Sequence, residues 1–217
     1  MTLGQEIVIG NLVLTEVMTF VTDVLISLVC LYAYRKLRKQ KYERKEAHHW
    51  SNFFLWMSIA SFIGGLSHLF FNYTGMPLKF ASWLLITLSV YFGEQGTIVL
   101  IKNEKLKNIL NIGSIVKLVL ISILIPIIGE FSICSAGVAA GLFGMVTTLH
   151  ATNYFSTKQK GSGLIALGIS INLFALLFRV KEISFHHWFN YNDIAHVILA
   201  LSCYIIYKGS KRKVALS

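Results

Sequence analysis

Seven long apolar stretches fill this chain, and they constrain its fold more than any other feature. They cover roughly residues 10–34, 50–73, 79–101, 111–129, 132–154, 162–180 and 189–207. A helix of about 20 apolar residues spans the hydrocarbon core of a bilayer. The stretches are continuous and do not alternate, which excludes a membrane β-barrel. The sequence therefore predicts an all-α, polytopic membrane protein in which residues 1–217 form one domain, a bundle of seven transmembrane helices.

The basic residues set the expected orientation of this bundle. If the helices alternate in direction, only Lys79, Arg179 and Lys181 of the 20 Lys and Arg residues fall on the side of the N-terminus. The other side carries Arg35, Lys36, Arg38, Lys39, Lys41, Arg44, Lys45, Lys102, Lys105, Lys107, Lys117 (at the start of the fourth helix), Lys158, Lys160, Lys208, Lys211, Arg212 and Lys213. Because Lys and Arg accumulate in cytoplasmic loops, we expect the N-terminus outside and the C-terminus inside.

Charge and composition exclude several classes of function. Topology and attraction to anionic lipid explain the net charge of +10, so no nucleic-acid partner is expected. The three cysteines are isolated, which argues against a cysteine metal site. The last stretch has no lysine before Lys208, which excludes a retinal protein. Short loops and a Lys/Ile-rich composition fit a bacterial inner membrane, with membrane lipid as the environment and a possible substrate.

The functional candidates are the ionisable residues inside the apolar stretches, because a charge in hydrocarbon costs at least a few kcal/mol. They are Glu16, Asp23, His68, Glu94, Asp193 and His196. At about 1.5 Å per helical residue, four of them share one level in the outer half of the membrane: Glu16, His68, Asp193 and His196. Asp23 is expected near the midplane. Glu94 is expected near the inner face, where it would snorkel or pair with Lys102.

Two imidazoles and one or two carboxylates at one level match the ligands of a zinc site. We expect His68, Asp193 and His196 to hold the metal. Glu16 would be a fourth ligand or a base. A bound metal would activate water for hydrolysis.

Two further residues would complete such a site. Asp23 would orient a ligand or relay protons, and Asn192 would steady a substrate carbonyl or oxyanion. In the alternative interpretation, the two histidines only form hydrogen bonds across helices, and the acidic residues pair helices or bind protons.

Packing signals are also present. Gly137, Gly141 and Gly144 share one stripe in the fifth stretch, and small residues let membrane helices approach closely. Pro126 is expected to end or kink the fourth helix. The rest of that helix is aliphatic and is expected to face lipid.

Two short segments carry a resemblance to a known family. The segment GGLSH ends at His68, late in the second helix, and the segment NDIAH ends at His196, early in the seventh. This arrangement resembles the alkaline-ceramidase-like (CREST) superfamily, which includes the alkaline ceramidases and the progestin and adipoQ receptors. The resemblance implies seven spans, a zinc site near the membrane face that bears the N-terminus, and hydrolysis of lipid amides.

The sequence departs from the family pattern at three positions. Gly64 stands where the family has a serine, and Asn192 stands where it has the first histidine of the seventh helix. No aspartate opens the third helix, where Ser82 is found. Asp193 or Glu16 would have to replace the missing ligand.

Two functions from different classes follow. The leading expectation is a metal-dependent intramembrane hydrolase that acts on a lipid-like amide or ester. The alternative is a transporter, channel or receptor that uses the same acidic and histidine residues to bind a proton, a cation or a lipid headgroup.

Overall fold

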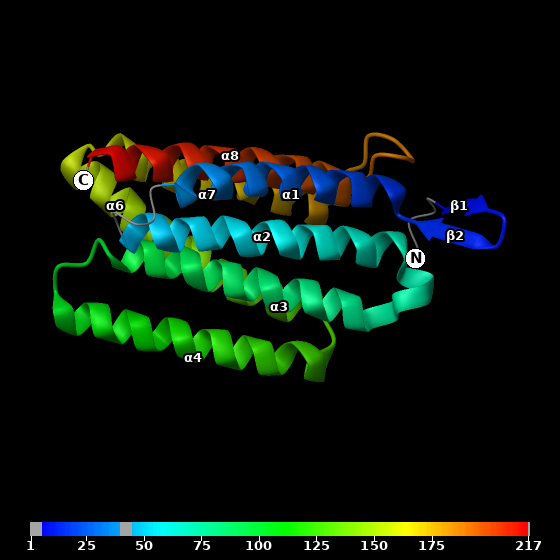
Figure 1. Cartoon of the computed structure of the whole chain (residues 1–217), viewed down its shortest axis with the longest axis horizontal. Helices are drawn as coiled ribbons and strands as arrows, with labels where there is room; N and C mark the ends of the chain where they lie inside the picture. Colours follow the sequence, from blue (N-terminus) through cyan, green and yellow to red (C-terminus); the bar gives the residue numbers. More distant parts are fainter. Residues whose placement is uncertain (1–5, 40–44, 217) are drawn as a thin grey trace.

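The computed structural model describes residues 6–39 and 45–216, the side chains of 213–216 excepted, and is helical almost throughout (Figure 1). Long helices lie side by side, and a short β-hairpin projects beyond one end of the bundle. The basic residues Lys41 and Arg44, and the side chain of Lys213, lie outside the described part. The elements are β1 (Glu6–Ile9), β2 (Leu12–Thr15), α1 (Val17–Arg38), α2 (Lys45–Leu69), α3 (Phe71–Ile98), α4 (Glu104–Ile128), α5 (Phe131–Val138), the π-helix η1 (Ala139–Thr147), α6 (Thr148–Thr157), α7 (Lys160–Val180) and α8 (Tyr191–Leu216).

The β-hairpin corrects the sequence prediction for residues 10–16, which we expected to begin the first transmembrane helix. Strands β1 and β2 pair antiparallel, with Glu6 opposite Thr15 and Ile9 opposite Leu12. Gly10 adopts a φ of +61° in the two-residue turn, a conformation that favours glycine. The flanking residues are mostly Val, Ile and Leu, and branched residues around a Gly-Asn pair are a hairpin signal. The apolar run therefore continues into α1, but helical structure begins only at Val17.

Six helical segments are long and apolar enough to cross a membrane: α1, α2, α3, α4, α7 and the continuous α5–η1–α6. The described residues thus support a multi-pass membrane protein. The sequence predicted seven spans. Helix α8 is 26 residues long but is not among the six; its apolar middle is bounded by Asp193 and Lys208.

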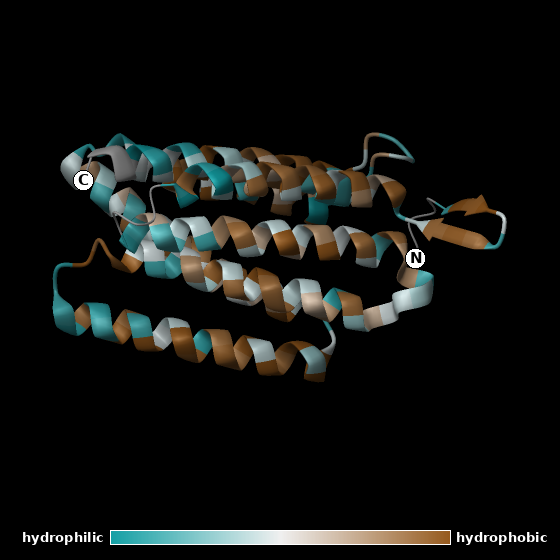
Figure 2. Cartoon of the chain, viewed as in Figure 1, coloured by the Kyte–Doolittle hydropathy of each residue, from teal (hydrophilic) through white to brown (hydrophobic). Residues whose placement is uncertain are grey.

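The helices surround a core that is built mainly on α2. This helix packs against α1 on one side and α3 on the other, while α8 packs against α7 and α1. Trp50, Phe53 and Phe54 fill the centre and are almost fully buried. Helix α4 packs mainly on α3 and α5 and is the least buried of the six segments. Apolar residues run along the helices, and hydrophilic residues gather at the end that holds the C-terminus (Figure 2).

The structure shows what forms at two predicted helix boundaries, one in α3 and one at the end of α4. The predicted connection at 74–78 is a kink within α3, where Gly75 has a φ of 58° and a ψ of −149° and Pro77 follows. Helix α4 ends two residues after Pro126, as predicted for a proline at this place. Gly129 caps it in the left-handed conformation, and its N–H donates to the Ile125 carbonyl at 2.9 Å.

Helices α7 and α8 approach closely at Gly168. A Cβ atom on Gly168 would lie 2.8 Å from Ile206 Cγ1, and 3.1 Å from both the Ile206 nitrogen and the Ser202 carbonyl oxygen. Two of these three atoms belong to the backbone of α8 and cannot rotate away. The contact therefore depends on the absence of a side chain.

We expect Gly168→Ala to lower the free energy of unfolding by about 1–3 kcal/mol, the usual effect of overpacking. Gly113→Ala is the matched control, because nothing lies within 4 Å of a Cβ at that exposed helical position. It should be neutral or stabilising by up to about 1 kcal/mol. Denaturant unfolding in detergent micelles measures both variants, and equal effects would contradict the close contact.

Candidate functional site

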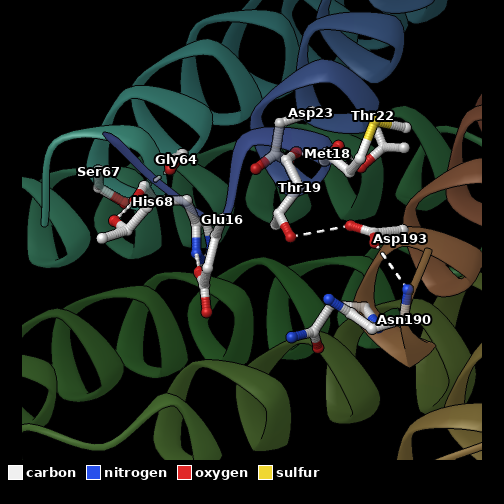
Figure 3. Close-up of polar contacts among 12 residues, drawn as sticks. Glu16, Met18, Thr19, Thr22, Asp23, Gly64, Ser67, His68, Asn190 and Asp193 are labelled. Carbon is white, nitrogen blue, oxygen red and sulfur yellow. Dashed lines mark hydrogen bonds and ion pairs between the residues drawn. The ribbon is translucent and has the colours of Figure 1, made fainter. Parts of the chain in front are cut away.

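A histidine–carboxylate pair marks the hairpin end of the bundle. The Nδ1–H of His68 in α2 donates to the carboxylate of Glu16 (Figure 3). Glu16 joins β2 to α1 with φ 47° and ψ 46° and makes no side-chain cap to the helix. A non-glycine residue in this left-handed conformation costs about 1 kcal/mol or more. This backbone conformation brings the Glu16 carboxylate to His68. The Thr15 hydroxyl donates a hydrogen bond to the His68 carbonyl and so joins the hairpin to α2.

A second histidine lies close to the first. His196 in α8 has its Nδ1 3.2 Å from Thr22 Oγ1 and 3.6 Å from Asp23 Oδ1. The Thr22 hydroxyl donates its own proton to the carbonyl of Met18 or Thr19, one turn back in α1. With its proton used in this way, the Thr22 oxygen is free to accept the proton of His196 Nδ1.

The two imidazoles share one tautomer by this reasoning. A carboxylate can only accept, so His68 also carries its proton on Nδ1. In the neutral form both rings then keep a bare lone pair on Nε2. The ring centroids are 6.5 Å apart, and the side chains of His68 and His196 are 24% and 21% exposed. Two imidazole rings from different helices therefore lie close together, and both are partly exposed.

Asp193 fixes the start of α8 against α1. Its Oδ1 accepts the Thr19 hydroxyl at 2.8 Å, and its Oδ2 accepts the Asn190 backbone N–H at 2.8 Å (Figure 3). Asn190 in turn accepts the N–H of Asn192 at 2.8 Å on its side-chain oxygen. This reciprocal pattern is a capping box. Asp193 therefore caps the N-terminus of α8.

The structure also identifies a residue that the sequence reasoning missed. Asn190 is 3% exposed, and its Nδ2 has no hydrogen-bond partner among the described residues. Asn192, which we expected to steady an oxyanion, is only half-buried. The Asn-x-x-Asp spacing before an apolar run is a helix-start signal and could have pointed to Asn190.

Two glycines of α2 allow α1 to pack closely against this helix at the site. A Cβ on Gly65 would lie 3.0 Å from Asp23 Cβ and 3.1 Å from Phe20 Cδ2. A Cβ on Gly64 would lie 2.9 Å from Ser82 Oγ and 3.7 Å from Asp23 Oδ2. Asp23 is consequently buried, at 6% exposure, where α1 crosses α2.

The structure brings together only some of the residues that the sequence predicted to form one site. Glu16, His68, His196 and Asp23 form a chain of contacts, and Asp193 is joined to it through α1. Among the described residues, no group of three or more His, Cys, Asp or Glu is placed to hold a metal ion. Glu94 lies elsewhere: its partner is Lys117, at 2.7 Å, and not Lys102 as predicted.

The comparisons place the chain in a family. The model of a family of unknown function (DUF6962) matches residues 18–215. The chain belongs to this family. Neither a curated protein nor a solved structure matches the chain. The matched region includes both histidines of the site, and the hairpin and Glu16 precede it.

Thr19→Val should destabilise the protein by about 1.5–3 kcal/mol, because it removes a hydrogen bond to the buried carboxylate of Asp193. Thr97→Val is the matched control. The buried Thr97 hydroxyl donates to the Gly93 carbonyl of its own helix at 2.8 Å, so its loss should cost much less. Unfolding in micelles measures both, and a control as damaging as Thr19→Val would show that this bond is not special.

The Glu16–His68 pair should make stability depend on pH. Burial raises the pKa of the Glu16 carboxyl, but the hydrogen bond and charge of His68 outweigh burial and hold its pKa below the ordinary value of 4.5. A lowered carboxyl pKa adds stability above the ordinary value, and this is lost as the pH falls through the lowered pKa.

Wild-type protein should therefore lose more stability on acidification below about pH 4.5 than Glu16→Gln does. Glu104→Gln, which alters an exposed pair with Lys107, serves as the control and should follow the wild type. Thermal unfolding from pH 3 to pH 7 makes the comparison. Parallel curves for wild type and Glu16→Gln would contradict a role for the pair.

Proposed function

We propose that this protein is a membrane-embedded, metal-dependent hydrolase that acts on a lipid-like amide or ester, as the alkaline ceramidases do. One observation carries the proposal: two imidazoles from α2 and α8 have Nδ1 committed to neighbouring groups and Nε2 left bare. Histidine ligands of metals usually donate the other ring N–H to a carboxylate or another acceptor. The Glu16–His68 and Thr22–His196 pairs have this form.

The donor set fits a transition metal in part. His68 and His196 would hold it through Nε2, and the third protein ligand, Asp193 or Glu16, is not in place beside them. Zinc, when bound, would supply Lewis-acid activation of a water and of the scissile carbonyl. The chain's own residues would orient the two imidazoles, hold a proton on Glu16 or Asp23, and offer the Asn190 amide to a carbonyl oxygen.

The location of the site supports a lipid-like substrate. The cluster lies at one end of the apolar helices, where His68, Glu16 and His196 are partly exposed. A membrane lipid with its polar linkage near the headgroup would present an amide or ester at this depth. We place the hairpin end outside the cell, as the seven-span arrangement and positive-inside rule predict, in a bacterial inner membrane.

The opposite end would face anionic lipid of the inner leaflet. Several of its cations lie over aromatic rings, among them Lys36 over Tyr32 at 5.5 Å and Lys208 over Tyr204 at 5.2 Å. Basic and aromatic residues together are typical of a membrane interface.

A second candidate function has its own support. In the part of the chain that the structure describes, no three potential ligands converge, and the carboxylate of Asp23 is buried beside His196. The cluster could thus bind a proton, a cation or a lipid headgroup in a transporter or receptor. Glu94 pairs with Lys117 of α4 and not with a member of this cluster, and this favours the hydrolase.

Metal content separates the two candidates. Protein purified in detergent without chelators should contain close to one zinc or other transition metal per chain. His68→Ala and His196→Ala should each lose most of it, because each removes one Nε2 ligand. His48→Ala, an exposed histidine bonded to Asn52 on α2, is the control and should keep it. Metal is measured by mass spectrometry.

A metal-free wild type would contradict the metal-dependent mechanism and favour the proton- or cation-binding alternative. If metal is present, hydrolysis of N-acyl and O-acyl lipids in vesicles tests the activity itself. The two histidine variants should then lose activity together with metal.

A further inference from the structure

A second charged pair lies away from the hairpin-end site. Lys117 Nζ is 2.7 Å from Glu94 Oε1. Glu94 is 1% exposed and lies four residues before the end of α3, toward the end of the bundle opposite the hairpin. Lys117 lies near the middle of α4, and its side chain is 18% exposed. Both helices are apolar segments of membrane-spanning length, so this pair is a functional candidate by default.

The hydrogen bonds of the pair are incomplete. Lys117 also donates to the Gly137 carbonyl at 3.3 Å. Glu94 Oε2 and the Ser114 hydroxyl are both buried, and neither makes a hydrogen bond of good geometry among the described residues, although the Ser114 hydroxyl lies near the Glu94 carboxyl. Ser114 is 2% exposed and lies three residues before Lys117, on the same face of α4. An ionised carboxylate oxygen without a partner is costly in a protein interior.

The Ser114 hydroxyl can pair with Glu94 Oε2 in either protonation state of the carboxyl. It donates to the ionised oxygen and accepts from the protonated one. Glu94 Oε1 still accepts from Lys117. The ammonium keeps its hydrogen bonds to Oε1 and to the Gly137 carbonyl in the protonated state, and its side chain is partly exposed. A metal cation fits less well, because it would be repelled by the ammonium beside Oε1.

The pair also touches the π-helix η1. A Cβ on Gly141 would lie 2.5 Å from Glu94 Oε1, 2.5 Å from Val90 Cγ1 and 2.6 Å from Lys117 Nζ. Only glycine at this position lets η1 lie against the pair. π-Helical segments are rare and occur frequently at functional sites. A change in the charge or position of the pair would therefore alter the packing of η1.

We propose that Glu94, Lys117 and Ser114 form a proton-binding site within the membrane domain, and that its occupancy sets how η1 packs against α3 and α4. The other titratable groups near the pair are His49 of α2, which packs against Phe92, and the buried Cys134 of α5. Helix η1 carries no titratable residue. The site is separate from the proposed metal site, so it does not depend on hydrolase activity.

Infrared difference spectroscopy between acidic and neutral pH, on protein in lipid nanodiscs, tests the proposal. The wild type should show a protonated-carboxyl band that Glu94→Gln loses. Ser114→Ala should shift the frequency of that band, because its acceptor is gone. Glu104→Gln should leave it unchanged. An identical band in wild type and Glu94→Gln, or no band that depends on Glu94, would overturn the proposal.

Two further variants keep the test decisive if Glu94→Gln does not fold. Lys117→Met leaves the carboxyl without its cation, so the protonated band should persist to higher pH than in the wild type. Gly141→Ala should change the pH at which the band is half-formed. Gly144→Ala, where a Cβ would meet only the Ala139 carbonyl at 3.8 Å, should not. Equal midpoints in all of these proteins would show a structural ion pair and overturn the proposal.

Discussion

Polar side chains buried among these helices must find partners inside the protein, because the hydrocarbon of a membrane offers none. Helix α1 and the residue before it supply hydrogen-bond partners for polar side chains at the hairpin end of the bundle. Its Thr19 binds Asp193 and its Thr22 binds His196, both on α8, while Glu16 just before it binds His68 on α2. The same contacts that satisfy the polar groups therefore fix three helices relative to one another. A site built on them is rigid without any help from a soluble domain.

Much of this arrangement could be predicted from the sequence. Long apolar runs predict helices because length and continuity are visible in the chain itself. Counting the helical rise from the helix ends also placed His68 and His196 at one level, and their rings do lie close together. Both predictions rest on properties local to one helix.

The parts that could not be predicted depend on contacts between elements. Residues 10–16 read as an apolar continuation of the first helix, because a hairpin of Val, Ile and Leu has the same hydropathy. Glu94 was expected to pair with Lys102, its neighbour in sequence. Its real partner is Lys117, and this depends on how far α4 is shifted along α3, which hydropathy does not encode. Asn190 rather than Asn192 is buried because the capping box fixes where α8 begins.

Contacts between elements also explain why a glycine stands at position 64. A side chain at position 64 would place its Cβ 2.9 Å from Ser82 Oγ, so the Ser82 hydroxyl would have to rotate away to admit it. The Ser82 hydroxyl, bonded to the Ala60 carbonyl, occupies the space between α2 and α3 that a side chain at 64 would need. The glycine at 64 leaves room both for this hydroxyl and for the carboxylate of Asp23, because a Cβ there would lie 2.9 Å from the first and 3.7 Å from the second. The absence of a side chain at 64 therefore lets α1 and α3 both pack closely against α2 at the level of the buried aspartate.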